Sequence, residues 1–224
     1  MNNATTPSPQ GEVGKHVAPD PLRKRAMRII KGTATFDDRF FPDHKDAVKL
    51  IEELQSMGCV IGFTTGVWDL FHIGHAQYMA VGKEEVAKLY PVADHVILVV
   101  GVDADSLAKG RKGEERPIVP MEERCKIIGH LRAVDVIVAQ TEPEQLYRSL
   151  PYDARVISKS TKDLPNRAEM ESYCEHLIEL EPQAETSTTA RVRKLHLNGA
   201  GVLGAKVLEA VQRVVDEELR GGKP

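Results

Sequence analysis

Short apolar runs alternate with helical patterns along most of the chain after residue 58. Five runs are rich in β-branched residues and nearly unbroken by polar side chains, which is typical of strands covered on both faces. These runs are 59–65, 95–102, 134–139, 154–158 and 176–181. Helical spacing of apolar residues occurs between them, at about 74–90, 120–132, 143–150 and 166–174. The alternation predicts right-handed β-α-β crossovers, and therefore an α/β, Rossmann-like parallel sheet of about five strands flanked by helices.

The segments before this region have a different pattern. Residues 1–21 are rich in Pro, Gly, Asn and Thr. Ordering them would cost more conformational entropy than burial returns, so we expect a flexible tail. Residues 22–57 form an N-terminal extension with one predicted helix, for which Asp43 is a possible N-cap and Gly58 the end. The apolar stripe of this helix comprises Val48, Leu50, Ile51 and Leu54.

The main domain is predicted to cover residues 58–198, and residues 199–224 are predicted to form an added C-terminal helix. Its apolar residues recur at helical spacing and are Leu203, Val207, Val211, Val214 and Val215. A helix with one apolar stripe has to bury it. We therefore expect this helix to pack on the sheet or on a partner chain.

Composition narrows the class of protein. A chain of 224 residues with 42% hydrophobic and 28% charged residues can bury one good core and carry an appendage. The net charge is −3, and Lys and Arg are spread along the chain. The sequence therefore shows no cluster of positive charge that would bind nucleic acid or an anionic membrane. No apolar run approaches the roughly 20 residues that a membrane span needs.

The N-terminus and the cysteines indicate a compartment. The first 21 residues lack the apolar core of a signal peptide, so we expect a cytoplasmic protein. Cys59, Cys125 and Cys174 are odd in number, far apart, and match neither a metal-ligand spacing nor a disulfide framework. We interpret them as reduced thiols that serve packing.

Candidate chemistry begins where the first predicted strand is followed by a helix. The stretch TTGVWDLFHIGHAQYM, residues 64–79, contains His72 and His75. In an open parallel sheet, ligands bind beyond the carboxyl ends of the strands. A helix that begins near Gly74 offers free N–H groups and a positive dipole end to a phosphate, and Gly66 and Gly74 allow close approach of main chain. The pattern favours a phosphate site in which both imidazoles act as donors.

Two other interpretations of the histidine pair stay open at this point. An H-x-x-H pair can be structural, or it can bind a metal, because residues at i and i+3 share a helix face. A zinc site needs a third protein ligand at a sensible spacing, and the nearest histidine, His95, falls inside a predicted strand. A Walker-type loop is excluded, since G-x-x-x-x-G-K-[ST] does not occur.

Three motifs in order resemble one family. GVWDLFHIGH, residues 66–75, is similar to the G-x-[FW]-D-x-x-H-x-G-H signature of the cytidylyltransferase-like nucleotidyltransferases. Residues 102–138 resemble the family's lysine-bearing segment, proline-containing turn, E-x-R helix start and V-D. TSTTARVRKL, residues 186–195, resembles its terminal S-T-T signature. The family includes glycerol-3-phosphate, choline-phosphate and ethanolamine-phosphate cytidylyltransferases and heptose-phosphate adenylyltransferases, and the resemblance covers about residues 59–195.

The resemblance implies a reaction and the residues that serve it. A nucleoside monophosphate would pass from CTP or ATP to the phosphate of a small phosphorylated alcohol or sugar, with release of pyrophosphate. His72 and His75 would stabilise charge on the triphosphate, and backbone N–H groups of residues 66–68 would approach the α-phosphate. Lys109, with Arg111 or Lys112 behind it on a loop, would contact the phosphates of both substrates. The catalytic candidates are thus His72, His75 and Lys109. The nucleotide- and phosphate-binding candidates are Thr65, Gly66, Val67, Trp68, Asp69, Gly74, Arg111, Lys112, Arg124, Arg132, Ser187, Thr188 and Thr189.

Partners follow from the same resemblance. Mg²⁺ bound mainly through the nucleotide's phosphate oxygens is expected, with no metal ligands from the protein, because such ions take few protein ligands. A homodimer is expected by family analogy. Binding to nucleic acid or to a membrane is not expected.

Each candidate also has an ordinary structural explanation. The KGRKGEERP segment can be a solvated charged loop, and Arg124 and Arg132 can be surface cations on a helix. Asp69 can cap a helix, although in this family we expect it to orient the loop; Trp68 is expected in packing rather than stacked on a base. Ser187, Thr188 and Thr189 can form a plain N-cap.

The sequence departs from the family at two places. An arginine usually precedes S-T-T, but the chain has EPQAETSTT there, with Pro182 and Glu185, and Arg191 or Arg193 is a candidate replacement. The loop after the fourth predicted strand reads SKSTKD, residues 158–163, instead of G-[DN]-D or G-G-D-Y. The choice between CTP and ATP therefore stays open, with CTP favoured by the FHIGH and KGEERPIVPMEER stretches.

Two other functions are alternatives. ISKS resembles the lysine-bearing loop of class I aminoacyl-tRNA synthetases, distant relatives that share H-x-G-H. A chain of this length has no room for a tRNA-binding domain. A non-catalytic nucleotide sensor or scaffold is the second alternative, and the intact His72, His75 and Lys109 argue against it.

Overall fold

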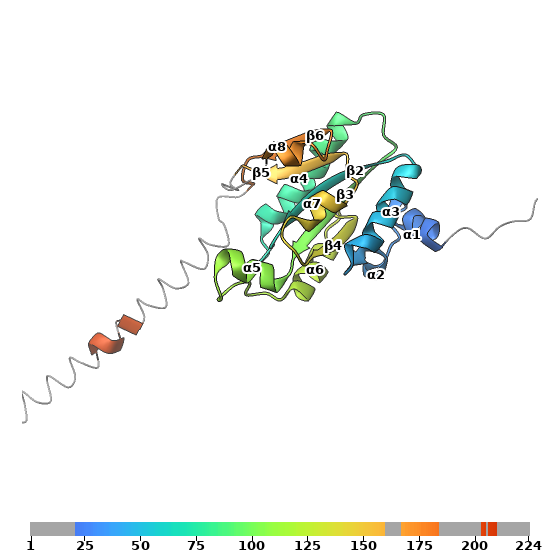
Figure 1. The fold of residues 1–224 in the computed structure, drawn as a ribbon. Coiled ribbons are helices and arrows are strands. Elements are labelled where there is room, and N and C mark those ends of the chain that lie inside the picture. The colour runs from blue at the N-terminus through green and yellow to red at the C-terminus, as the bar shows by residue number, and fades with distance from the viewer. Residues whose placement is uncertain (1–20, 160–166, 184–202, 205, 210–224) are drawn as a thin grey trace, which may run out of the picture.

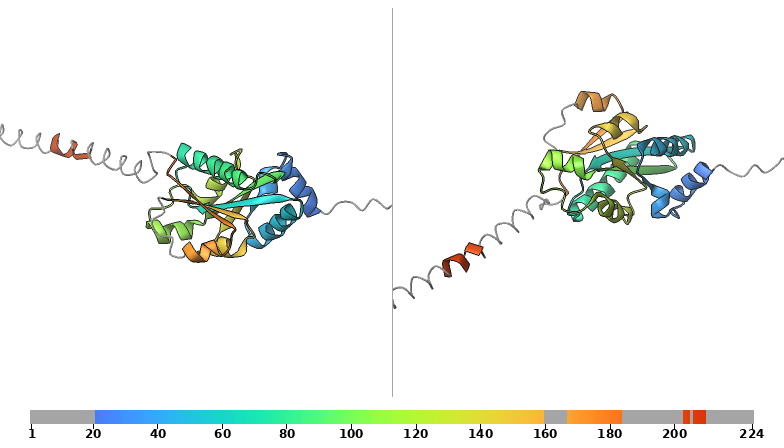
Figure 2. Two further views of the ribbon diagram at one scale, coloured as in Figure 1. Left: turned by 90° about the horizontal axis from the view of Figure 1, so that it is seen from above. Right: turned by 60° about the horizontal axis from the view of Figure 1, so that its bottom comes forward.

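The computed structural model describes residues 21–159, 167–183, 203–204 and 206–209. Their strands form one sheet of six parallel strands in the order β1-β4-β3-β2-β5-β6. Helices cover both faces of this sheet (Figures 1 and 2). The strands are β1 (Phe40–Phe41), β2 (Cys59–Gly66), β3 (His95–Asp103), β4 (Val136–Gln140), β5 (Ala154–Ser158) and β6 (His176–Leu180). The predicted Rossmann-like α/β fold is confirmed.

The five predicted strands are all present, and β1 is the one that the sequence did not predict. β1 is only two residues long, and it pairs with β4 through Phe40 and Ile137. Two aromatic residues carry no period that identifies a strand, so a short edge strand like this is visible only once its partner is placed. The sheet therefore has six strands rather than about five.

The helices largely match the predicted segments, with two corrections to the charged and N-terminal regions. They are α1 (Pro21–Ile30), α2 (Phe36–Arg39), α3 (His44–Ser56), α4 (Ile73–Leu89), α5 (Asp105–Lys112), α6 (Met121–Gly129), α7 (Gln145–Ser149) and α8 (Arg167–Glu171). The N-terminal extension holds three helices, not one, because α1 and α2 were missed. The segment with Lys109 and Arg111 is the helix α5 rather than a loop.

Two apolar cores lie on the two faces of the sheet. On one face, α3, α7 and α8 pack on the sheet and α1 packs on α3, with Leu50, Leu54 and Phe63 buried completely. On the other face, α4 and α6 pack through residues such as Met79 and Ile128. Because both faces are covered, the strands need the nearly unbroken apolar sequence from which they were predicted.

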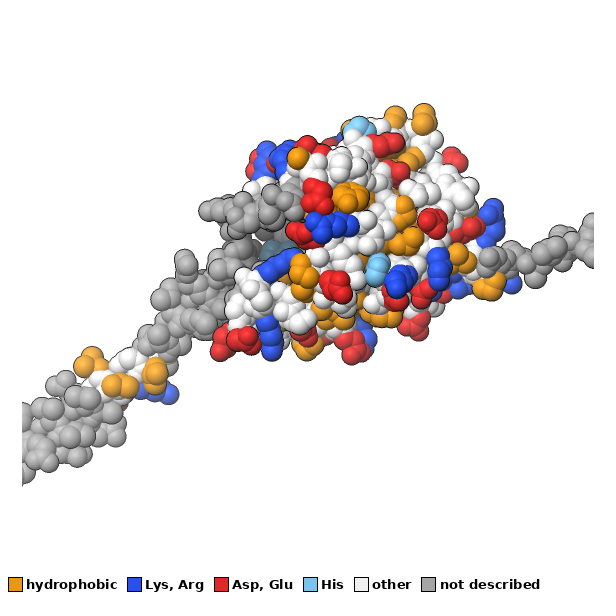
Figure 3. Space-filling view, viewed as in Figure 1, with side chains coloured by type: hydrophobic (Ala, Val, Ile, Leu, Met, Phe, Trp, Pro, Cys, Tyr) orange, Lys and Arg blue, Asp and Glu red, His pale blue; other side chains and the backbone are white. Residues whose placement is uncertain are grey.

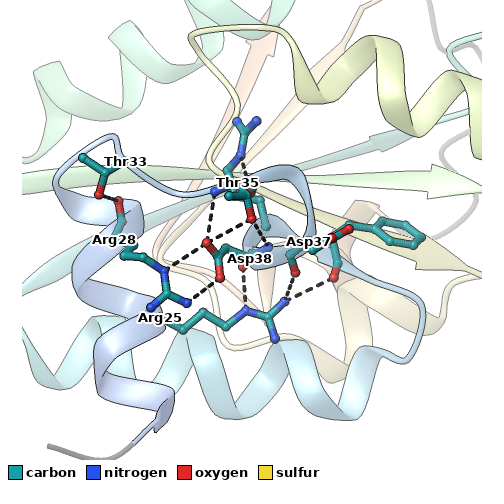
Figure 4. Close-up of polar contacts among 8 residues, drawn as sticks. Arg25, Arg28, Thr33, Thr35, Asp37 and Asp38 are labelled. Atoms are coloured by element: carbon teal, nitrogen blue, oxygen red, sulfur yellow. Dashed lines mark hydrogen bonds and ion pairs between the residues drawn. The ribbon is translucent and has the colours of Figure 1, made fainter.

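The N-terminal extension is attached to the sheet by arginines. The guanidinium of Arg25 lies 4.0 Å from the centroid of the Phe41 ring. It also donates to the backbone carbonyls of Asp37 and Asp38 (Figure 4). Arg28 pairs with the carboxylate of Asp38, which also completes the N-terminal cap of α2. The extension therefore packs as part of the domain.

Arg39 connects the extension to α6. Its guanidinium donates to the carbonyl oxygen of Gly129, the last residue of α6, and to that of Val134, at 3.1 Å. A cation is favourable there, because the last carbonyls of a helix lack intrahelical partners. The extension thus holds the end of α6.

The ends of the chain lie mostly outside the described residues. The flexible tail predicted for residues 1–21 falls there except for Pro21, which begins α1. Residues 203–204 and 206–209 are helical, and the side chains of Leu203, Val207 and Leu208 are each more than half exposed. Packing of the predicted C-terminal helix on the sheet or on a partner chain stays a prediction, because most of its residues lie outside the described part of the chain.

The described surface carries both signs of charge. On the face drawn in Figure 3, Lys and Arg side chains are interspersed with Asp and Glu. Among the described residues, none of the helices combines the length and the apolar character of a membrane span.

Candidate active site

The carboxyl ends of the strands meet at one edge of the sheet because all six are parallel. β2 lies between β3 and β5, so the chain moves outward from β2 in both directions and its order reverses beside β2. Open α/β sheets bind ligands at such a reversal, outside the carboxyl ends of the strands. The loop after β2, which leads to His72 and His75, lies at this point.

His72 begins α4 as its N-cap. Its Nδ1 accepts a hydrogen bond from the backbone N–H of Gly74 at 3.1 Å. An accepting Nδ1 carries no proton, so the neutral ring keeps its proton on Nε2. One hydrogen bond therefore caps the helix, and the N–H donor of the neutral ring is at Nε2.

His75 lies in the first turn of α4, directly against His72. The two imidazole rings are stacked, with centroids 3.8 Å apart and planes 25° apart. The Trp68 ring meets His75 edge-on at 5.5 Å, and Phe71 lies 5.3 Å from it. This packing holds both histidines at the N-terminus of α4, where the positive end of the helix dipole favours an anion.

Trp68 serves the packing of the site. Its Nε1–H donates to the carbonyl oxygen of Gly101 in β3 at 2.8 Å, and its backbone has a positive φ of 55°. A Cβ on Gly66 would lie 3.0 Å from the Trp68 ring. Gly66 is thus needed to admit the indole, a reason that the sequence did not show.

Asp69 joins the loop after β2 to the segment before α6. Its buried carboxylate accepts from the backbone N–H groups of Ile118 and Val119 at 3.1 and 2.9 Å and pairs with Arg116 at 2.8 Å. Burial alone would raise the pKa of Asp69, but the backbone N–H groups and Arg116 outweigh it, and the pKa lies below its ordinary value. Asp69 therefore orients two loops.

Arg116 was not among the candidates from sequence. It stands in a charged stretch that resembles a solvated loop, yet only 12% of its side chain is exposed. Its carboxylate partner is 47 positions earlier in the chain, so no local pattern could have identified the pair.

Arg124 is buried completely, which overturns the interpretation of a surface cation. Its guanidinium donates to the carbonyl oxygens of Val67, Val119 (2.8 Å) and Asp103 (2.9 Å), and to the carboxylate of Asp105 (2.6 Å). Each of the three guanidinium nitrogens of Arg124 thus donates a hydrogen bond to a protein oxygen. It holds the loops after β2 and β3 together and does not offer itself to a phosphate.

The other candidate cations are placed differently from one another. Lys109 is half exposed, with Nζ 4.0 Å from a carboxylate oxygen of Glu114, and Arg111 pairs with Asp103 at 2.9 Å. Lys112 is the last residue of α5. Arg132 is exposed, but it lies in the turn that leads into β4. That turn is at the amino end of β4, the edge of the sheet opposite the histidines, and it is not part of a helix. Phosphate binding by Arg132 finds no support in this position and stays untested.

Some predicted site residues lie outside the described part of the chain. They are Ser187, Thr188, Thr189, and the possible replacement arginines Arg191 and Arg193. Of the SKSTKD loop, Ser158 and Lys159 are described; Ser158 ends β5, and Lys159 pairs with Glu181. Thr65 ends in a buried hydroxyl without a hydrogen-bond partner. Within the described ranges, no three His, Cys, Asp or Glu side chains are grouped to hold a metal ion.

The fold and the histidine-capped helix at the order reversal define a nucleotide-binding α/β domain of the Rossmann type. The family model described as cytidylyltransferase-like matches residues 63–221. The chain belongs to this family of nucleotidyltransferases.

Three curated relatives of the chain share one name. The chain is 31% identical over 148 residues to "Bifunctional protein HldE" of Nitratiruptor sp., a match of 65% of this chain and 30% of that protein. It is 37% identical over 133 residues to the protein of that name from Helicobacter pylori strain G27, covering 58% of this chain and 27% of the relative. It is 30% identical over 177 residues to the protein of that name from Escherichia coli O1:K1 / APEC, covering 77% of this chain and 35% of the relative. The chain thus spans about a third of the length of these relatives.

One solved structure resembles the chain at 23% identity. It is described as the lipopolysaccharide core biosynthesis protein from Thermoplasma volcanium GSS1. The TM-score is 0.43, with 54% of this chain and 95% of that chain covered.

Proposed function

We propose that the protein is a nucleotidylyltransferase that transfers a nucleoside monophosphate from CTP or ATP to the phosphate of a small phosphorylated alcohol or sugar. The observation that carries this proposal is the stacked pair His72 and His75 at the N-terminus of α4, beside the order reversal of the sheet. Membership of the cytidylyltransferase-like family supports the same reaction type.

The reaction needs positioning and charge neutralisation rather than a base. An oxygen of the acceptor's phosphate attacks the α-phosphorus, the bond from that phosphorus to the bridging oxygen breaks, and pyrophosphate leaves with the electron pair. A phosphate monoester has its second pKa at about 6, so the nucleophile is already an anion at neutral pH. His72 through Nε2–H, His75 and the positive dipole end of α4 stabilise the charge that accumulates on the phosphoryl oxygens.

The nucleotide is the finer part of the proposal. The sequence motifs favour CTP, whereas the relatives named HldE favour ATP and a sugar phosphate. The described residues include only Ser158 and Lys159 of the loop that would read the base. Turnover with CTP and with ATP therefore has to be compared directly to identify the nucleotide.

Mg²⁺ belongs to the proposal as an ion bound through the nucleotide. The carboxylates at the described edge of the sheet, Asp69 and Asp103, are engaged by N–H groups and arginines. This donor set fits an ion that takes its oxygens mainly from the phosphates, where it would neutralise charge on the triphosphate. A cytoplasmic location and a homodimer remain predictions.

A pyrophosphate-release screen tests the proposal. CTP, ATP, GTP and UTP are each paired with phosphorylated polyols, aminoalcohols and sugars, with Mg²⁺ present or removed by a chelator. We expect release for one pair, and loss of release on chelation. Nucleotide binding without release for any pair would favour a sensor or scaffold, and tRNA-dependent consumption of ATP would favour a synthetase relative.

A further inference from the structure

The outward side of α1 is basic. Residues 21–31 contain five Arg and Lys residues and no Asp or Glu. Ala26 and Ile29 are buried, and α1 packs on α3. Lys24, Arg28 and Lys31 are spaced i, i+4 and i+7, so they share the opposite side of the helix over about 10.5 Å. These cations form one outward row.

The surface along this row is hollowed. A hollow of about 640 Å³ is lined by the partly buried Met27, by Thr33 and by four cations, which are Arg23, Lys24, Arg28 and Lys31. Thr33 lies against Arg28 at one end (Figure 4). We call these six residues the basic hollow. Two of its arginines pair with carboxylates of α3 and α2, whereas Lys24 and Lys31 form no ion pair with a described residue.

These features select among anionic partners. An amphipathic helix binds a membrane by inserting its apolar side, and that side of α1 is already buried. A single phosphate cannot contact cations spread over about 10.5 Å. Nucleic acid needs several uncompensated cations, and here two of the four are paired within a chain of net charge −3. A protein surface with an apolar side chain between carboxylates fits best.

The chain itself carries such a surface between α5 and α6. Ile118 is 51% exposed, although its backbone N–H is bound to the carboxylate of Asp69. Exposed carboxylates stand before and after it in the sequence, at Glu114, Glu115, Glu122 and Glu123. The arginine of this segment, Arg116, is turned inward to Asp69. We call residues 114–123 the acidic ridge.

The acidic ridge has charge to offer to a partner. Glu114 lies 4.0 Å from Lys109, and Glu122 pairs with Lys126. Glu115 and Glu123, in contrast, form no ion pair within the described part of the chain. Because Asp69 fixes the backbone of the ridge, little conformational entropy is lost when a partner binds it.

We propose that the basic hollow of one copy binds the acidic ridge of a second copy of this chain. Ile118 enters the hollow beside Met27, whose unbranched side chain adapts to the shape of its neighbour. Glu115 and Glu123 pair with Lys24 and Lys31, and this complementarity of charge orients the two copies. In a two-fold dimer each copy supplies both surfaces, so the contact is made twice.

This contact is independent of the proposed function. α1 lies outside residues 63–221, which the family model matches, so membership of the family does not imply a contact through α1. Its test measures association rather than turnover, and failure of either proposal leaves the other standing.

Sedimentation velocity of the full chain at several concentrations tests the contact by charge reversal. We expect the wild-type protein to associate, and to do so less at high salt. The double variants Lys24→Glu with Lys31→Glu and Glu115→Lys with Glu123→Lys should each raise the dissociation constant by about tenfold or more, since four exposed ion pairs become repulsive. Circular dichroism should show that both variants fold, because all four side chains are exposed.

Mixing the two double variants is the decisive step. The reversed hollow of one variant complements the reversed ridge of the other, so the equimolar mixture should associate as the wild-type protein does. Lys88→Glu with Arg132→Glu is the matched control, because it changes the net charge as much as the Lys24 and Lys31 reversal does, at exposed positions away from both surfaces. This control should associate like the wild-type protein.

Three results would overturn the proposal. They are a wild-type protein that stays monomeric, reversed variants that associate as well as the wild-type protein, and a mixture that does not regain association. A monomer that binds vesicles of phosphatidylserine and phosphatidylcholine, or duplex DNA, through Lys24 and Lys31 would assign the basic hollow to that partner instead.

Discussion

At the scale of single residues, His72 combines a structural and a chemical role in one ring. Nδ1 caps α4, and this bond assigns the proton of the neutral ring to Nε2. The two roles use different atoms, so substitutions can separate them. His75, stacked on the same ring, is held by aromatic contacts on its other sides.

His72→Asn should keep the cap and remove the donor. An asparagine side-chain oxygen can accept from Gly74 N–H as the imidazole does, whereas Nε2–H is lost. We expect kcat to fall by about 10²–10³-fold, with the melting temperature nearly unchanged.

His72→Ala is the matched comparison, because it removes the cap as well. It should cost about 1 kcal/mol of stability in addition, or about 2–4 °C in the melting temperature. Thermal melts and steady-state kinetics of both variants check this. Wild-type kcat in His72→Asn would contradict the role of His72 in the reaction.

At the scale of elements, arginines connect both ends of α6 to distant parts of the chain. Near its start, Arg124 connects it to the loops after β2 and β3. At its end, Arg39 of the N-terminal extension donates to Gly129 and Val134. The extension therefore stabilises the helix that carries Arg124.

Arg39→Met should destabilise the fold by about 1–3 kcal/mol, since the carbonyl of Gly129 at the end of α6 and that of Val134 before β4 lose a charged donor. Urea unfolding followed by circular dichroism measures this. Arg132→Met is the control, because Arg132 is an exposed cation in the turn between α6 and β4. It should change the unfolding free energy by less than about 0.5 kcal/mol. Equal effects of the two substitutions would show that Arg39 does not hold α6.

At the scale of the whole molecule, buried carboxylates couple the fold to pH. The pKa of Asp69 lies below its ordinary value because backbone N–H groups and Arg116 outweigh burial. Such a group stabilises the fold above its unfolded pKa of about 4, and this contribution is lost as the pH falls through the lower folded pKa. Asp135 acts in the opposite sense, because burial raises its pKa even though Lys83 opposes this.

Asp69→Asn should make stability less dependent on acid. We expect the melting temperature of the wild-type protein to fall as the pH drops below about 4, and the variant to show a flatter fall from a lower starting value, since it has no proton to take up at this position. Melting curves between pH 7 and pH 2.5 measure both slopes. A slope as steep as that of the wild-type protein would assign the acid sensitivity to other carboxylates.

The sequence predicted the strands and the position of the histidine pair in the fold well, and the polar network poorly. β-branched runs located five strands, and the place of His72 after the first of them put the histidine pair at the carboxyl edge of the sheet. α5 was missed because KGRKGEE has no apolar stripe, and Ala108 alone is buried among the side chains of residues 105–111. β1 was missed because two phenylalanines form a strand only against β4.

By itself, the sequence determined the order of strands and helices and the position of the histidines at the carboxyl edge, because periodicity and helix start signals are local properties of the chain. Only the tertiary structure decided that Arg124 is buried, that Arg116 pairs with Asp69, and that Arg111 is held by Asp103. Arg124 and the Val67 carbonyl that it binds are 57 positions apart. Whether an arginine meets water, a carboxylate or a carbonyl depends on which distant loop folds against it, and no local pattern records that.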